Sequence, residues 1–200
     1  MRDASFPKRL VLVNALVPLA LLLWDGMHHR LGANPGEFAT RATGVLALVF
    51  LVLSLAVTPL RKALGQPGLV RLRRMLGLFS FAYAVLHLFT YLWFYKAFQW
   101  PAILADIGKR PFIMLGMGTF LILLPLAATS HNKVIRWMGG RRWARLHKLA
   151  YLAGVLAVLH YDLLVKADTR IPLAFAFVVA ALLGYRLLNR WRPRWTEWPS

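Results

Sequence analysis

The sequence contains no cysteine, and this absence excludes several kinds of site. Disulfides, iron–sulfur clusters held by thiolates and covalently attached c-type haem all need cysteine sulfur. Acidic residues are also scarce: 7 Asp and Glu stand against 25 Lys and Arg, for a formal net charge of +18.

The basic residues lie almost entirely between long apolar runs. This pattern is typical of loops that flank membrane spans, where Lys and Arg face anionic lipid and the cytoplasm. It argues against binding of nucleic acid. Hydrophobic residues make up 59% of the 200 residues, whereas a soluble domain is nearer half apolar and shows its apolar residues in stripes. We expect a protein surrounded by membrane lipid.

Six segments are apolar enough to cross the membrane, which takes roughly 20 residues for about 30 Å of hydrocarbon. They are residues 10–27, 43–60, 75–95, 111–129, 144–165 and 171–188. The first segment lacks the small-x-small cleavage site of a signal peptide and is expected to remain as a span. Short loops predict an all-α bundle that forms one domain over residues 1–200. No internal repeat is evident in the sequence.

Lys and Arg are distributed unevenly between the two sets of loops. The N-terminal tail, the connections 61–74 and 130–148, and the segment from residue 186 onward hold 18 of the 25 basic residues. Because basic residues concentrate on the cytoplasmic side, we expect both termini in the cytoplasm. Without the first span the split would weaken to 15 against 10, which favours about six spans.

Three of the six histidines, His87, His147 and His160, fall inside predicted spans. His87 lies about twelve residues into the third span and His160 about sixteen into the fifth, which runs in the same direction, so both reach the outer half at about 1.5 Å per residue. A histidine inside the bilayer is costly unless it is paired or bound. Neutral imidazole is the usual axial ligand of membrane b-type haem, so this pair predicts an iron site.

Small side chains precede both histidines at the same distances, seven and three residues earlier. They are Ser80 and Ala84 before His87, and Ala153 and Ala157 before His160. Small residues on the face of a ligand leave room for a flat macrocycle. We therefore expect these four residues to contact the cofactor.

His147 lies about 20 Å nearer the cytoplasm than His160 and about 140° out of phase with it on an ideal helix. The residue thirteen positions before His87 is Arg74, so a second pair of histidines is incomplete. Arg74 and Arg73 are instead candidates for binding haem propionates or a flavin phosphate, because Arg favours bidentate contacts with anions. A second haem, a flavin and a merely solvated His147 all stay open.

Several segments carry a resemblance to a known family: residues 74–87, 143–151 and 159–161 around the histidines, and the span ends 55–61 and 126–130. They resemble the haem-binding membrane subunits of bacterial protein-methionine-sulfoxide reductases, which belong with the ferric-reductase-like transmembrane domains. The resemblance covers essentially the whole chain. It implies that His87, His147 and His160 are ligands of haem b, present once or twice, and that FMN also binds.

The resemblance further implies a role in electron transfer in the bacterial inner membrane. A cytoplasmic flavin reductase or the quinone pool would supply electrons, and a periplasmic molybdopterin subunit would reduce methionine sulfoxide in oxidised envelope proteins. The chain would then be an electron-transfer subunit and not the catalytic reductase.

Two other functions remain open. One is an independent b-type cytochrome that acts as a ferric reductase or quinol oxidase. The other is a small transporter or channel that relays protons through histidines, although the scarcity of carboxylates in the spans argues against it.

Overall fold

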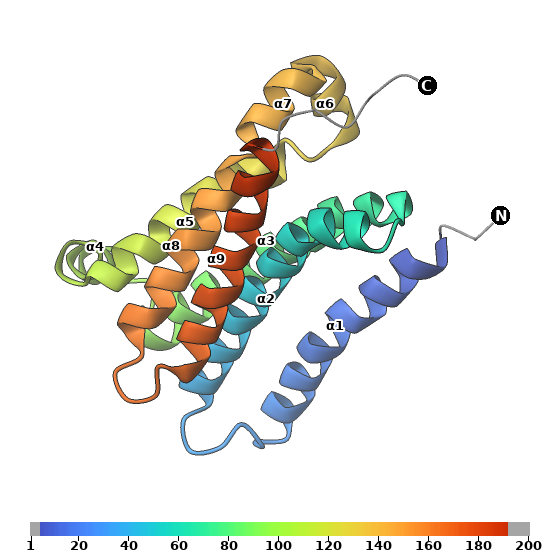
Figure 1. The fold of residues 1–200 in the computed structure, drawn as a ribbon. Coiled ribbons are helices and arrows are strands. Elements are labelled where there is room, and N and C mark those ends of the chain that lie inside the picture. The colour runs from blue at the N-terminus through green and yellow to red at the C-terminus, as the bar shows by residue number, and fades with distance from the viewer. Residues whose placement is uncertain (1–4, 192–200) are drawn as a thin grey trace, which may run out of the picture.

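A computed structural model of the chain describes residues 5–191, and these residues form helices and connections without a strand. Six long helices dominate (Figure 1). They are α1 (Ser5–Met27), α2 (Pro35–Ala63), α3 (Val70–Tyr91), α5 (Pro111–Ala128), α8 (Leu149–Leu164) and α9 (Arg170–Trp191). The short helices are α4 (Trp100–Lys109), α6 (Asn132–Met138) and α7 (Gly140–Leu146), with a 3-10 turn η1 (Pro67–Leu69) before α3 and a π-helix η2 (Leu92–Lys96) after it.

Five of the described helices are long and apolar enough to cross a membrane. They are Pro7–Met27, Pro35–Ala63, Pro67–Lys96, Pro111–Ala128 and Arg170–Leu188. Together with the predominance of helix, they confirm the predicted multi-pass helical fold. The remaining predicted span, the fifth (residues 144–165), corresponds to α8, which has only 16 residues.

The prediction of one continuous helix over residues 144–165 is wrong at its start. Residues before His147 belong to α7, and α8 begins only at Leu149. Between the two helices the N–H groups of Lys148, Ala150 and Tyr151 donate to carbonyls three residues earlier. Bonds of this spacing tighten the chain into a turn. His147 therefore lies at the junction of two helices, and not inside a span.

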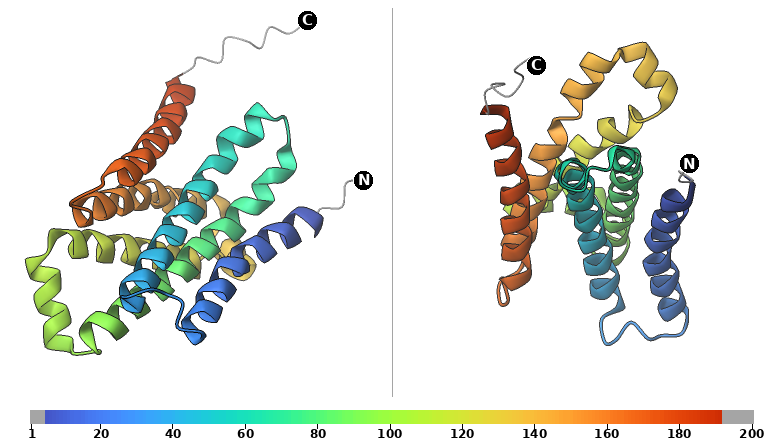
Figure 2. Two further views of the ribbon diagram at one scale, coloured as in Figure 1. Left: turned by 90° about the horizontal axis from the view of Figure 1, so that it is seen from below. Right: turned by 45° about the vertical axis from the view of Figure 1, so that its right-hand side comes forward.

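The long helices pack mainly as two antiparallel pairs, α2 with α3 and α5 with α8. The most extensive contacts join α2 to α3 and α5 to α8, while α9 packs on α8 and α2, and α1 packs on α3. Figures 1 and 2 show the start of α1, the α2–α3 connection and the end of α9 at one end of the bundle. Both ends of the described chain thus lie on one side, and their cytoplasmic location stays a prediction. Arg2, Arg192 and Arg194, which contribute to the charge count, lie outside the described residues.

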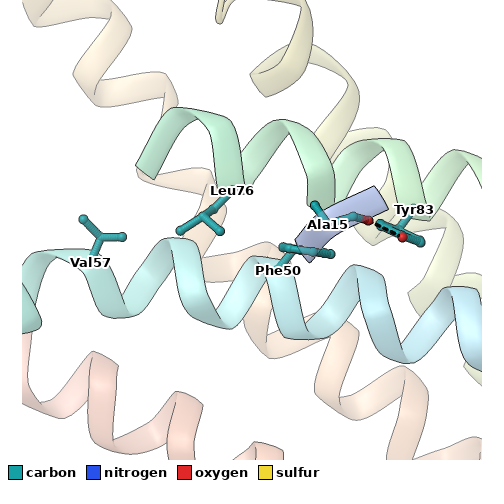
Figure 3. Close-up of a cluster of buried hydrophobic side chains, with 5 residues drawn as sticks. All are labelled: Ala15, Phe50, Val57, Leu76 and Tyr83. Carbon is teal, nitrogen blue, oxygen red and sulfur yellow. Dashed lines mark hydrogen bonds between the residues drawn. The ribbon is translucent and has the colours of Figure 1, made fainter. Parts of the chain in front are cut away.

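A buried cluster of Ala15, Phe50, Val57, Leu76 and Tyr83 joins α1, α2 and α3 (Figure 3). The Tyr83 ring stacks on Phe50 with centroids 5.4 Å apart, and its hydroxyl donates to the Ala15 carbonyl at 2.6 Å. Because a buried hydroxyl must be hydrogen-bonded, this bond fixes where α1 meets α3.

Two serines tie α2 to α3. The Ser54 hydroxyl donates to the Arg73 carbonyl at 3.0 Å, and the Ser80 hydroxyl donates to the Ala47 carbonyl at 2.9 Å. Small polar residues let membrane helices approach closely and hydrogen-bond across their interface. The α2–α3 pair is therefore held in a defined register.

Candidate cofactor site

His87 on α3 and His160 on α8 face each other in the middle of the bundle. Their ring centroids lie 6.0 Å apart, and the ring planes are inclined at 80°. The prediction that these two histidines share one depth on neighbouring helices is confirmed. Seventy-three residues of sequence separate them, so the pair exists only because the α2–α3 and α5–α8 units pack together.

The Nδ1 atom of each ring is bound to a backbone carbonyl of the adjacent helix. The Nδ1 atom of His87 lies 2.8 Å from the Thr40 carbonyl, and that of His160 lies 2.6 Å from the Phe112 carbonyl. A carbonyl can only accept, so Nδ1 donates the proton and Nε2 keeps its lone pair. This is the tautomer and orientation of a metal-binding histidine, in which the second nitrogen is fixed by an outer hydrogen bond.

A glycine lies against each ring, one helical turn after the residue that supplies the carbonyl. A Cβ atom on Gly44 would lie 2.8 Å from Nδ1 of His87, and one on Gly116 would lie 2.8 Å from Nδ1 of His160. Real Cβ atoms essentially never approach other atoms so closely. The α2–α3 and α5–α8 pairs thus share one arrangement. In each, one helix supplies a carbonyl and a glycine four residues later, and the other helix supplies the histidine that contacts both. This structural repeat is not evident in the sequence.

The spacing of the rings fits a single metal ion held from both sides. A metal–imidazole bond is about 2 Å long and the ring centre lies about 1 Å further, so two opposed imidazoles have centroids roughly 6 Å apart. The separation here is 6.0 Å. Within the described residues, no group of three or more His, Cys, Asp or Glu side chains converges on a point. The distance between the two rings is thus the one that two imidazoles sharing a metal ion would have.

A cavity of about 590 Å³ surrounds the two histidines, within the range of about 300–1,000 Å³ that cofactor sites occupy. Its walls come from α2, α3, α5 and α8, and most of them are apolar, including Leu48, Leu51, Leu88, Phe112, Ile113 and Leu123. Among the predicted small residues, Ser80, Ala84 and Ala157 line this cavity. Their small side chains widen it between the helices.

Three predicted contact residues lie elsewhere. Ala153 is fully buried but packs in the helix interface beside Leu51 and Leu123, and it does not line the cavity. Arg73 and Arg74 do not line it either. The guanidinium of Arg74 donates to the Asn132 side chain and, at 3.5 Å, to the Ser130 carbonyl. The prediction that Ala153 contacts a cofactor beside His160 is therefore wrong, whereas Arg73 and Arg74 were expected at the inner level of His147 and stay a prediction there.

His147 is not brought to the histidine pair. It stacks on Trp143 with ring centroids 4.0 Å apart, and its Nδ1 lies 3.2 Å from the Trp143 carbonyl. The Trp143 indole in turn donates to the Thr129 carbonyl at 3.1 Å, which ties α7 to the end of α5. The Nε2 atom of His147 is buried and makes no hydrogen bond of standard geometry, and the Leu126 carbonyl lies nearby. The ring is thus held at the inner end of the bundle with one nitrogen available.

The opposite end of the cavity is charged. The Asp106 carboxylate on α4 accepts from the Tyr91 hydroxyl at 2.8 Å and pairs with Lys96 at 2.5 Å and with Arg110 at 3.5 Å. The Lys96 and Asp106 side chains are only 14% and 12% exposed. This network fastens α4, a helix that the sequence did not indicate, across the mouth of the cavity.

Comparisons with known proteins support the family that the sequence resembles. A family model described as "Ferric reductase like transmembrane component" matches residues 43–158, a range that includes His87 and His147 and ends two residues before His160. Relatives named "Protein-methionine-sulfoxide reductase heme-binding subunit MsrQ" match almost the full chain. The chain belongs to the MsrQ family.

The identity to MsrQ relatives is high and even. The protein of Polaromonas naphthalenivorans is 46% identical over 92% of this chain and 85% of its own length. That of Bordetella pertussis is 44% identical over 94% and 91%, and that of Rhodospirillum rubrum is 48% identical over 92% and 88%. No solved structure matches the chain.

Four residues of this MsrQ-family site were missed by sequence reasoning: Thr40, Gly44, Phe112 and Gly116. Glycines inside apolar spans are a visible signal, because glycine in a membrane helix often marks close approach. However, the sequence has further glycines within its helices, such as Gly77, Gly118 and Gly154. Only the packing of the helices shows which glycines lie opposite a histidine.

The network at the cavity mouth predicts an acid-sensitive contribution to stability. The pKa of the Asp106 carboxyl lies below its ordinary value of 3.8, chiefly because Lys96 donates a hydrogen bond to it, while burial acts in the opposite direction. A carboxyl with a lowered pKa stabilises the fold above the unfolded-state pKa, and this contribution is lost as the pH falls through the folded-state value. We therefore expect thermal stability to fall below about pH 4.

The substitution Asp106→Asn tests this expectation. At neutral pH it leaves Lys96 without its anion and should destabilise the fold by about 1–3 kcal/mol. It should also flatten the decline in melting temperature between neutral pH and pH values below about 4. The control is Asp168→Asn, which removes only the exposed pair with Arg170 and should change little. An acid profile of Asp106→Asn that matches the wild-type profile would contradict the role given to Asp106.

Proposed function

We propose that this protein is the haem-binding electron-transfer subunit of a methionine-sulfoxide reductase system, with His87 and His160 as the axial ligands of a b-type haem. One observation carries the proposal: two imidazoles 6.0 Å apart, both turned by backbone carbonyls so that Nε2 is available, border one apolar cavity. The relatives are named as haem-binding subunits, which supports the proposal.

When bound, haem supplies an iron that changes oxidation state by one electron within the low-dielectric interior. The residues of the chain hold and tune this centre. His87 and His160 bind through Nε2, and the carbonyls of Thr40 and Phe112 hold the two rings in orientation. The apolar walls exclude water, and exclusion of water is one of the levers by which a protein sets a haem potential.

We infer the orientation of the protein in the membrane from its charge distribution, and the direction of electron transfer from that orientation. Most basic residues lie at the end of the bundle that holds the α2–α3 connection and the α6–α7 hairpin, as expected for the cytoplasmic side. The His87–His160 pair lies toward the other end, near the α4 helix. With the basic end on the cytoplasmic side of a bacterial inner membrane, we propose that the haem lies nearer the periplasm, where a molybdopterin partner of the MsrP type would accept electrons.

The donor side requires a carrier in the inner half of the bilayer, because about 30 Å of hydrocarbon separates the two surfaces. His147, whose buried Nε2 makes no hydrogen bond of standard geometry, is the candidate ligand or support for that carrier. The family resemblance implies a second haem or FMN in this role, fed by a cytoplasmic flavin reductase or by quinol. We propose that this series of electron carriers serves the repair of oxidised methionine in envelope proteins.

A visible spectrum of the purified full-length protein tests the proposal. After haem-replete expression, the reduced protein should show the sharp bands of low-spin haem with two histidine ligands, and electrons should pass to the molybdopterin partner with loss of methionine sulfoxide. Absence of those bands would overturn the haem proposal. Haem reduction without any transfer to the partner would instead favour an independent b-type cytochrome.

Replacing His147 by alanine separates the inner carrier from the outer haem. Because His147 is held at the α7–α8 junction, away from the cavity, we expect the His87–His160 haem signal to survive. Flavin content or a second haem, measured by flavin release and by pyridine haemochrome, should fall, and reduction by the donor should slow. Loss of the outer haem signal in this variant would contradict the assignment.

A further inference from the structure

We propose that Arg41 and Arg110 bind the two propionate carboxylates of the haem at the charged mouth of the cavity, so that the carboxylates face the α4 end of the bundle. This inference rests on the proposed function. It concerns the haem of the His87–His160 pair, whereas the prediction for Arg73 and Arg74 concerns an inner cofactor near His147, and it assigns the orientation of the haem in its cavity.

The first support is the polarity of the cavity. Its charged lining residues are Glu37, Arg41, Lys96, Asp106 and Arg110, and they all come from the start of α2, the end of η2, α4 and the start of α5. The rest of its lining carries no Asp, Glu, Lys or Arg. Haem is itself amphipathic, with an apolar ring and two carboxylates on one edge. A carboxylate buried without a partner is costly, so the carboxylate edge of the haem is expected at the charged end of the cavity.

The second support is the supply of donors. Arg41 contacts Glu37 through a single Nη atom at 3.0 Å, and Arg110 contacts Asp106 through Nε at 3.5 Å. A guanidinium has five N–H donors, so each arginine retains donors that match a carboxylate. Their side chains are 63% and 56% exposed and thus free to turn toward the cavity. Lys96, by contrast, is committed to its buried pair with Asp106.

The third support is the balance of charge. Three cations and two carboxylates line the mouth, which leaves one positive charge in excess. By contrast, Arg74 is thirteen residues before His87 on the same helix, or about 20 Å away along its axis. It is also engaged with Ser130 and Asn132 beyond the inner end of the cavity. The mouth is therefore the better partner for anionic groups.

The experiment compares two iron porphyrins that differ only in those carboxylates. The detergent-solubilised full-length apoprotein is titrated with ferric protoporphyrin IX and with its dimethyl ester, and binding is followed by the Soret absorbance. Because charge-assisted hydrogen bonds are among the stronger ones, we expect the wild type to prefer the free acid by about tenfold. The double variant R41Q/R110Q should reduce this preference to about twofold or less.

The ester provides the internal control for folding, since R41Q/R110Q should bind it as tightly as the wild type does. The matched variant R73Q/R74Q, which removes two cations at the other end, should keep the full preference. If R41Q/R110Q binds neither porphyrin, the single variants R41Q and R110Q are measured instead, and each should lower the preference about threefold.

The outcomes distinguish failure of the proposed haem binding from failure of the roles given to Arg41 and Arg110. If neither porphyrin binds the wild type, the proposed function fails and the inference fails with it. If both bind the wild type equally, or if the R41Q and R110Q substitutions leave the preference intact, the inference is overturned while haem binding stands. Loss of the preference in R73Q/R74Q alone would place the carboxylates at the inner end.

Discussion

Replacing either His87 or His160 by alanine is expected to abolish the same haem signal. In the proposed site each of the two neighbouring rings would provide one of two ligands to the same iron, so neither would hold a low-spin iron alone. Loss of an outer-shell partner typically costs about 10–100-fold in metal affinity, and loss of the ligand itself should cost more than about 100-fold. Reduced spectra and haem-to-protein ratios measure both effects.

His131→Ala is the matched control. This histidine is exposed at the start of α6, where its ring accepts from the Lys133 N–H, and it has no contact with the cavity. Its removal should leave haem content unchanged. A full haem spectrum in either His87→Ala or His160→Ala would show that the two rings do not clamp one iron.

Gly44→Ala and Gly116→Ala are expected to have nearly as large an effect, although neither residue carries a ligand. The new methyl carbon would lie 2.8 Å from Nδ1 of the histidine opposite, and the hydrogen bond from that Nδ1 to a backbone carbonyl lies on the same side of the ring. The ring must therefore move and lose its fixed orientation. We expect at least about a tenfold loss of haem affinity in each variant, as for other outer-shell changes.

Two glycines in the same helix pairs serve as controls. A Cβ on Gly118 of α5 would lie 3.8 Å from Leu156, and one on Gly77 of α3 would lie 3.6 Å from the Ser54 hydroxyl oxygen, both ordinary contact distances. Glycine inside a helix costs roughly 1 kcal/mol relative to alanine, so Gly118→Ala and Gly77→Ala should be neutral or stabilising. Equal haem retention in Gly116→Ala and Gly118→Ala would refute the steric role of Gly116.

Prediction from the sequence succeeded where the physics is local. The lipid bilayer requires long apolar helices, so hydropathy alone located the segments. Five of the six predicted spans correspond to helices that are long enough to cross a membrane. The pairing of His87 with His160 also followed, because the rise per residue converts sequence position into depth. Depth can be read from one helix at a time.

Prediction from the sequence failed for features that depend on which face of a helix packs against which neighbouring helix. Ala153 has the same spacing from His160 that Ser80 has from His87, yet only Ser80 lines the cavity. The sequence also did not indicate that Arg74 hydrogen-bonds to Ser130 and Asn132 at the start of the α6–α7 hairpin. The helix break at His147 depends on bonds to residues three positions earlier, which apolar periodicity does not reveal.

The sequence by itself determined that this protein is a bundle of membrane helices with two histidines at matched depth, because both properties follow from hydropathy and helical rise. The tertiary structure alone decided how those histidines are held. The carbonyls of Thr40 and Phe112 and the side-chain-free faces of Gly44 and Gly116 contact rings that are 43 to 48 residues away in the chain. No local rule relates residues at that separation, and only the packing of α2 on α3 and of α5 on α8 brings them together.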